Sequence, residues 1–231
     1  MTENSKQNKF ASVTAYIKNY VDASTVKSVL LLMGAILLFI SGSLIYGIIL
    51  NLRQVPLKEA MHDKGFSELR HPNIIIDRSN FTLNLYEDSI LVKTYRASFG
   101  RNVHKIKSEA DDEATPVGTY KICAIDTANQ YHIFFRLNYP NVEDASEALR
   151  KGWISQKEFN QIKFEFFYEG CPKYNKVLGG NIGIHGVGKF NFIFKNLPFV
   201  YNWTNGSIAL SDEDIDELYS VVKIGTKVVI K

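Results

Sequence analysis

The hydrophobic pattern separates one long apolar run from a series of short alternating segments that follow it. Residues 28–50 contain no charged side chain and consist mainly of Leu, Ile, Val, Gly, Ala and Phe. At a helical rise of about 1.5 Å per residue, such a run can cross a hydrocarbon core of about 30 Å. It is longer than a typical signal-peptide core and ends without a small-x-small cleavage site. The pattern therefore predicts one uncleaved transmembrane helix over residues 28–50.

The charges beside this run indicate its orientation. Basic residues are more frequent before it than directly after it: Lys6, Lys9, Lys18 and Lys27 precede it, and Arg53 and Lys58 follow it. By the positive-inside rule, this asymmetry places the N-terminus in the cytoplasm and the bulk of the chain outside. We expect residues 1–27 to form a cytoplasmic tail, either as a short polar segment or as a juxtamembrane amphipathic helix.

A linker and one folded domain should follow the membrane helix. Pro56, Gly65 and Pro72 interrupt residues 51–72, a composition typical of a tether. The 231 residues suffice for one domain of ordinary size plus an anchor. We therefore expect the folded domain to occupy residues 73–231.

Short β-rich or alternating segments predict the strands of this domain. They cover residues 73–77, 82–86, 90–95, 131–137, 182–185 and 226–230. Helices are predicted over residues 144–151, from the capping box of Ser155 and Glu158, and after Ser211. The pattern predicts a mainly β fold with short helices (α+β). The first two helices form an insert that either shapes a substrate groove or covers the open end of a barrel.

Composition and charge exclude several function classes. Lys and Arg number 27 against 24 Asp and Glu, so no basic surface argues for nucleic acid. No cluster of His, Cys and carboxylates has metal-ligand spacing, and we expect neither a metal nor an organic cofactor. Cys123 and Cys171 both fall in the external part, where a disulfide can form. Of the two states we favour unpaired, buried cysteines, which pack as small apolar side chains.

Two segments have an unusual composition. Residues 101–114 are rich in charge and are predicted to form a mobile surface loop. The stretch from residue 190 to 203 is rich in aromatic side chains: Phe190, Phe192, Phe194, Phe199, Tyr201 and Trp203. Because aromatic side chains bury large areas, we expect most of them in the core and one or two beside a site.

Several motifs occur in a fixed order along the domain. The segment Ile184-His185-Gly186 is followed after a loop by Thr204-Asn205-Gly206-Ser207, and Thr115-Pro116-Val117-Gly118 lies upstream. This order resembles the L,D-transpeptidase catalytic domain (YkuD-like) family, in which I-x-I-H-G precedes [ST]-x-G-C. The resemblance covers about Ile74 to Ile230. It implies a β-sandwich or barrel, here preceded by one transmembrane helix.

The resemblance also implies a chemistry. In the family, a cysteine thiolate attacks a carbonyl of a peptidoglycan stem peptide, and an amine or water then resolves the acyl-enzyme. By resemblance, His185 is the base and Ser207 occupies the position of the nucleophile. Gly186, Thr204, Asn205 and Gly206 are the expected substrate-binding residues. The implied partners are peptidoglycan stem peptides and the membrane, with the domain on the periplasmic side of the inner membrane.

Ser207 departs from the family pattern, because the usual residue there is Cys. A serine hydroxyl is far less acidic than a thiol and needs a well-oriented base. Three readings follow: a serine-using enzyme, a catalytically inactive pseudoenzyme that binds peptidoglycan, or a Cys→Ser substitution introduced into an active enzyme. Asn205 and Ala209 stand where many members have His and Arg; this form resembles the branch that detaches a lipoprotein from peptidoglycan. Cys171, upstream of His185, is a further hypothetical nucleophile.

Overall fold

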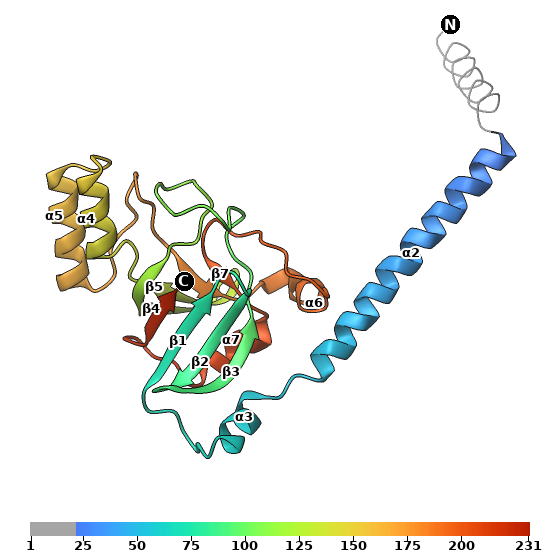
Figure 1. Ribbon diagram of the computed structural model, residues 1–231, viewed down its shortest axis with the longest axis horizontal. Coiled ribbons are helices and arrows are strands. Elements are labelled where there is room, and N and C mark those ends of the chain that lie inside the picture. The colour runs from blue at the N-terminus through green and yellow to red at the C-terminus, as the bar shows by residue number, and fades with distance from the viewer. Residues whose placement is uncertain (1–21) are drawn as a thin grey trace, which may run out of the picture.

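The computed structural model describes residues 22–231, in which a long helix leads into a mixed β domain (Figure 1). The long helix α2 spans Ala23–Leu52 and is apolar enough to cross a membrane. It contains the whole run predicted over residues 28–50. Asp22 caps its first turn by accepting the backbone N–H of Ser24. Most of the tail predicted over residues 1–27 lies outside the described residues.

Eight strands form one mixed sheet in the order β3-β2-β1-β8-β4-β5-β6-β7. Their bounds are Pro72–Asp77 (β1), Thr82–Glu87 (β2), Ile90–Arg96 (β3), Gly118–Asn129 (β4), His132–Leu137 (β5), Gly183–His185 (β6), Ile208–Ala209 (β7) and Lys227–Ile230 (β8). Only the β1–β8 and β6–β7 pairs are parallel, and the others are antiparallel. The prediction of a mainly β fold with short helices is confirmed.

The two edges of this sheet meet, so the sheet closes on itself. Just after β3, the N–H of Ser98 donates to the carbonyl of Ala209 in β7 at 2.8 Å, and the Ala209 N–H donates back at 2.9 Å. This one bridge joins the two ends of the strand order, while β3 itself pairs, among the described strands, only with β2. The bridge also brings the end of β3 next to the turn that precedes β7.

The core lies inside this closed sheet and under helix α7 (Asp212–Tyr219). Alternate residues of β1, β2 and β5 are buried, as the period-2 pattern predicted. The largest fully buried side chains come from the seven strands β1 to β7 and the segment after β3: Tyr95, Tyr120, Phe99, Phe135, Ile74, Ile76, Leu83, Leu85, Ile122, Leu137, Ile184 and Ile208. Ser211 caps α7, as predicted, and α7 buries Ile215 and Leu218.

The expected linker is much shorter than residues 51–72. Residues Leu57–Asp63 form helix α3, which buries Leu57 and Met61 in the main core. The backbone N–H of Leu57 also donates to the carboxylate of Glu217 in α7 at 2.9 Å. Our assumption that the fold begins after this stretch was therefore wrong, because two apolar side chains of the supposed tether complete the core. Only residues 53–56 separate α2 from α3.

The helical insert is a small packed unit of its own. Helix α4 (Val142–Arg150) and helix α5 (Gln156–Phe164) continue into a π-helical turn, η1 (Glu165–Glu169). The predicted capping box of Ser155 and Glu158 is present. The insert has a separate apolar cluster, made of Ala145, Ala148, Ile154, Ile162 and Leu178. It lies at the opposite side of the domain from α2 (Figure 1).

A disulfide joins the end of this insert to the sheet. Cys171, after η1, is bonded to Cys123 in β4, with the Cα atoms 5.4 Å apart. Our expectation of unpaired cysteines was wrong, because folding brings together two positions 48 residues apart. The hypothesis of Cys171 as a substitute nucleophile is also wrong, since its sulfur carries no free thiol.

Candidate functional site

The register of β6 and β7 brings His185 and Ser207 to one face of the sheet. Ile184 pairs with Ile208, and both side chains point into the core. Because neighbouring residues of a strand face opposite ways, His185 and Ser207 project from the other face as diagonal neighbours. Both line the same open cavity, whose volume is about 680 Å³. The two predicted catalytic residues therefore share one site.

His185 is held in one tautomer and kept neutral. Its Nδ1 lies 2.6 Å from the backbone carbonyl of Gly186, and a carbonyl can only accept, so Nδ1 carries the hydrogen. The lone pair is then on Nε2. Burial lowers the pKa of His185 to about 4, although the bond to Gly186 and the charge of Asp212 act in the opposite direction. At neutral pH the ring is therefore uncharged, and its Nε2 can accept a proton.

Three aromatic rings surround the imidazole. Tyr131 lies 4.8 Å from it between ring centroids, Phe134 stacks on it at 5.8 Å, and Trp203 meets it edge-on at 5.8 Å. Phe134 is there because it pairs with His185 across β5 and β6. These rings exclude water from the base and explain its low pKa. Of these three residues, only Trp203 belongs to the aromatic stretch in which the sequence predicted one or two side chains beside a site.

The turn before β7 fixes the position of Ser207. The Thr204 hydroxyl donates to the Ser207 carbonyl at 2.6 Å and accepts the Gly206 N–H at 3.3 Å. Gly206 has φ of +113°, and a Cβ there would lie 2.6 Å from the carbonyl oxygen of Ala114. The Ser207 Oγ accepts the Gly183 N–H at 3.2 Å. Of the predicted substrate-binding residues, Thr204 and Asn205 line the cavity, while Gly206 shapes the turn.

Gly186 and Asp212 shape the loop that follows the histidine. The Asp212 Oδ1 accepts the N–H groups of Val187 at 2.7 Å and Gly188 at 2.9 Å. A Cβ at Gly186 would collide with the same oxygen, so only glycine allows this approach. The sequence indicated Asp212 only as an acid in the first turn of a helix, because its second role depends on tertiary contact.

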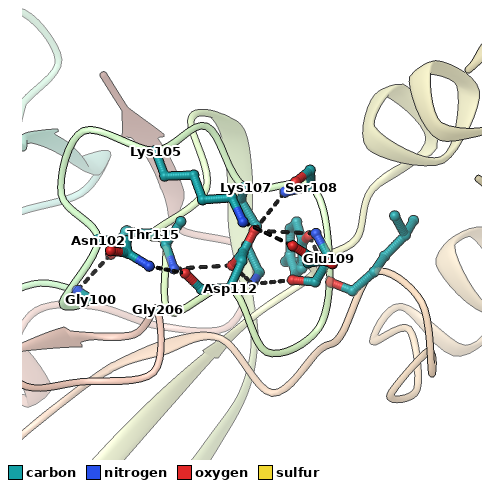
Figure 2. A network of polar contacts seen from close by, with 12 residues as sticks. Gly100, Asn102, Lys105, Lys107, Ser108, Glu109, Asp112, Thr115 and Gly206 are labelled. Atoms are coloured by element: carbon teal, nitrogen blue, oxygen red, sulfur yellow. Dashed lines mark hydrogen bonds and ion pairs between the residues drawn. The ribbon is translucent and has the colours of Figure 1, made fainter.

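The charged stretch 101–114, hereafter the polar loop, has no helix or strand and is largely at the surface, as predicted, but it is organised around one buried carboxylate. The Asp112 carboxylate is fully buried and accepts Lys107 Nζ at 2.8 Å. It also accepts three backbone N–H groups, from Ser108, Glu109 and Ala114 (Figure 2). Burial raises the pKa of Asp112, but these hydrogen bonds outweigh it and hold the pKa below its ordinary value. One internal carboxylate thus organises the loop.

The polar loop supports the turn that carries Ser207. At the base of the loop, the Gly100 N–H donates to the Thr115 hydroxyl at 3.0 Å, and the Arg101 N–H donates to the Thr204 carbonyl at 3.2 Å. A Cβ at Gly100 would lie only 3.1 Å from the Cα of Gly206. The Thr-Pro-Val-Gly motif therefore joins the loop to the site.

The aromatic stretch also differs from its prediction. Residues 188–201, hereafter the aromatic segment, contain the short helices η2 (Gly188–Phe190) and α6 (Asn191–Lys195). Most of its aromatic side chains are more than half exposed, namely Phe190, Phe192, Phe199 and Tyr201. The expectation of core packing was wrong for these, because the core was already filled by strand residues. Trp203, just beyond the segment, lines the site as expected.

Several further residues line the cavity and were not predicted as site residues, among them Arg101, Asp126, Tyr131, Phe134 and Arg136. Phe134 and Arg136 alternate along β5 on the face of His185. This alternation is readable in the sequence, but the pairing of β5 with β6 is not.

One group within residues 22–231 has the composition of a metal site. His71, Glu87 and Asp88 place ligand atoms within 4.8 Å of one another. The Glu87 carboxylate, however, already accepts the N–H groups of Arg70 and His71. The group is not part of the cavity of His185 and Ser207.

Comparison with known families agrees with this arrangement. A model of the L,D-transpeptidase catalytic domain (YkuD) matches residues 71–230. The chain belongs to this family. The match covers all eight strands and contains both His185 and Ser207, whereas helices α2 and α3 precede it. No curated protein matches the chain.

The chain also resembles solved structures, at low sequence identity. An L,D-transpeptidase from Xylanimonas cellulosilytica has a TM-score of 0.38 and 17% identity, over 77% of this chain and 70% of that one. The helical cell shape determining protein Pgp2 of Campylobacter jejuni has a TM-score of 0.45 and 16% identity, over 76% and 55%. An L,D-transpeptidase from Mycobacterium tuberculosis has a TM-score of 0.39 and 16% identity, over 69% of this chain and 58% of that one. The chain thus spans little more than half of the last two.

Proposed function

We propose that the protein is a membrane-anchored cell-wall enzyme that performs acyl transfer or hydrolysis at peptidoglycan stem peptides. One observation carries this proposal: a neutral, tautomerically fixed His185 and the hydroxyl of Ser207 face the same cavity from adjacent strands. That pair is what a nucleophile and its base require.

The proposed reaction follows from the positions of these two groups. The Ser207 Oγ attacks the stem-peptide carbonyl while His185 Nε2 takes the hydroxyl proton. The new C–O bond forms, the C–N bond breaks, and the proton passes from His185 to the departing amine. An amine of a second stem then attacks the ester to give a cross-link, or water attacks it to give hydrolysis. Either attack returns the proton to Ser207 through His185.

The lining of the cavity suits a charged peptide. Arg101 and Arg136 contribute positive charge, and Asp126 contributes negative charge. Stem peptides carry carboxylates and a side-chain amine, so both signs have a counterpart. The indole N–H of Trp203 and the Nε of Arg136 are buried without a hydrogen-bond partner among the described residues. Such unpaired donors are available to a bound ligand.

A second candidate is a peptidoglycan-binding pseudoenzyme. The hydrogen bond of Ser207 Oγ is with the Gly183 N–H rather than with the His185 ring. The Gly183 N–H donates to the hydroxyl oxygen of Ser207 and cannot take the hydroxyl proton, as a base would. A hydroxyl also has a much higher pKa than the thiol that is usual in this family. In this candidate the cavity binds stem peptides and does not turn them over.

The deciding experiment measures muropeptides by mass spectrometry. Isolated peptidoglycan is incubated with the full-length chain in detergent micelles, either unchanged or as Ser207→Ala or Ser207→Cys. A profile altered by the unchanged chain and not by Ser207→Ala supports Ser207 as a working nucleophile. Activity only in Ser207→Cys supports the pseudoenzyme, because the rest of the site is then competent and only the cysteine nucleophile is missing. If no variant changes the profile, the proposal of stem-peptide chemistry at this site is wrong.

We further propose that α2 spans the inner membrane, with residues 1–27 in the cytoplasm and the domain in the periplasm. The disulfide between Cys123 and Cys171 supports an oxidising compartment for the domain. Protease added to intact spheroplasts should digest the domain and leave the N-terminal tail protected. Protection of the domain in intact spheroplasts would contradict this topology.

A further inference from the structure

The aromatic segment lies against the end of the membrane helix that is nearest to the domain (Figure 1). Gly47 is the buried residue of α2, and a Cβ at that position would collide with the backbone carbonyl of Asn196. Gly42, further from the domain, has open space around it. The side chain of Asn51 donates to the carbonyl of Lys195 at 2.5 Å and to the Oδ1 of Asn196 at 2.9 Å. These contacts fix the segment beside the last turns of α2.

The short link between α2 and α3 restricts how far the aromatic segment can move away from the end of α2. Only residues 53–56 join α2 to α3, and four residues reach about 14 Å when fully extended. Helix α3 is itself held in the main core by Leu57 and Met61. The domain therefore stays within one short link of the point where α2 leaves the membrane.

The position of Gly47 sets the depth of the segment. Gly47 lies inside the uncharged run of residues 28–50, three positions before its end. At about 1.5 Å per residue it is about 5 Å from the end of that run. The run of 23 residues is about 35 Å long as a helix and exceeds a hydrocarbon core of about 30 Å by about 2 Å at each end, so a backbone that touches Gly47 lies within a few Å of the boundary between hydrocarbon and headgroups when α2 spans a bilayer.

The exposed side chains of the segment suit that boundary. Phe190, Phe192, Ile193, Phe199 and Tyr201 are each at least half exposed, and Lys189 is exposed beside them. Aromatic and basic residues are enriched at the interface between membrane and water, where the ring is partly buried and the charge meets lipid phosphates. Exposed apolar side chains gathered in one segment mark a site of contact with a protein or a membrane.

We propose that the aromatic segment docks into the outer headgroup region of the bilayer that α2 spans. The proposal rests on the membrane anchoring proposed above and adds a second membrane contact. It also bears on the site. The Phe194 ring lies 5.5 Å from Trp203, which lines the cavity and contacts His185, so the segment packs against a ring of the site. The bilayer thereby fixes both the height and the orientation of the site.

Depth-dependent fluorescence quenching tests the proposal on the full-length chain. Single cysteines are introduced by Phe192→Cys in the segment, Tyr168→Cys in η1 and Leu38→Cys in α2, with the native disulfide left closed. Each is labelled with an environment-sensitive fluorophore, and the protein is reconstituted in vesicles of phosphatidylethanolamine and phosphatidylglycerol. Quenchers are lipids spin-labelled near the headgroup, lipids spin-labelled near the chain end, and aqueous iodide.

The proposal predicts that the label at position 192 is quenched by the shallow lipid and protected several-fold from iodide relative to position 168. Tyr168 is the matched control, because it is an exposed aromatic in η1, which continues helix α5, and α5 lies on the side of the domain away from α2 (Figure 1). Equal iodide access at both positions overturns the docking. Protection from both iodide and lipid overturns it as well, because a second copy or a partner protein then covers the segment. If Leu38→Cys is not quenched by the deep lipid, the membrane anchor itself fails, which is a distinct result.

A substitution in α2 tests whether the contact at Gly47 holds the segment in place. Gly47→Leu should push the backbone near Asn196 away and increase iodide quenching at position 192. Gly42→Leu, one and a half turns earlier and without a neighbour, should leave it unchanged. Equal effects of the two substitutions would show that the contact at Gly47 does not position the segment.

Discussion

The polar loop reaches the cavity through Arg101, the aromatic segment packs on Trp203, which lines it, and in both regions the burial of side chains differs from what the composition suggests. The polar loop (residues 101–114) is rich in charge, yet its central carboxylate at Asp112 is fully buried. The aromatic segment (residues 188–201) is rich in apolar rings, yet most of them are exposed. A charge can be buried when an opposite charge and several N–H groups surround it. The exposed rings lie outside the main core cluster, which is formed largely by strand residues. Burial thus depends on available partners more than on residue type.

The largest expected effect comes from removing the central carboxylate of the polar loop. Asp112→Ala leaves Lys107 buried and unpaired and should lower the free energy of unfolding by about 3–5 kcal/mol. Denaturation of the full-length chain in detergent micelles, followed by tryptophan fluorescence, measures it. The double variant Lys107→Met with Asp112→Asn should lose less, because it removes both charges and keeps an acceptor for the backbone. A loss in Asp112→Ala no greater than in Glu109→Ala, an exposed position, would contradict the role of the network.

The next effect lies where the polar loop meets the turn of Ser207. Gly206→Ala forces a side chain into positive φ and against the Ala114 carbonyl, and should cost about 1–3 kcal/mol of unfolding free energy. Gly225→Ala is the matched control, since Gly225 has φ of +96° but no neighbour within 4 Å. The difference between the two isolates the contact with the loop. Equal costs would mean that the loop does not support the turn.

A smaller effect concerns the aromatic side of the site and the protonation of His185. Its folded pKa of about 4 lies below the ordinary value of 6.5. The unfolded chain therefore binds more protons between these pH values, and this group's contribution to stability is present above pH 6.5 and lost as the pH falls toward 4. Imidazole NMR signals should show a midpoint near pH 4. Trp203→Ala admits water and should move the midpoint upward. An unchanged midpoint would show that the ring does not control the hydration of the base.

The smallest effect is expected for the exposed rings. Phe192→Ser should change the unfolding free energy in detergent micelles by no more than about 0.5 kcal/mol, because an exposed side chain makes few packing contacts that the substitution can remove. Phe135→Ser, in the core, is the contrasting variant and should be severely destabilising. A large loss for Phe192→Ser would show that the aromatic segment is part of the folded core rather than a surface.

Much of the site was visible in the sequence because its motifs are local. The I-H-G and T-N-G-S segments were each read as short units, and their order identified the family. The rings around His185 were not found in this way. Tyr131 and Phe134 reach it only because β5 pairs with β6, and a strand's alternation does not name its neighbour. The role of Asp212 likewise depends on the loop that folds back onto α7.

The sequence by itself determined the elements whose cause is local. An uncharged run predicted α2, period-2 alternation predicted most strands, and side chains that bond their own backbone predicted the caps at Ser155 and Ser211. Tertiary structure alone decided which distant groups become partners. It closed the disulfide of Cys123 and Cys171, drew Leu57 into the core, and paired Asp112 with Lys107. The physical reason is that burial and pairing depend on distances in space, which sequence separation does not fix.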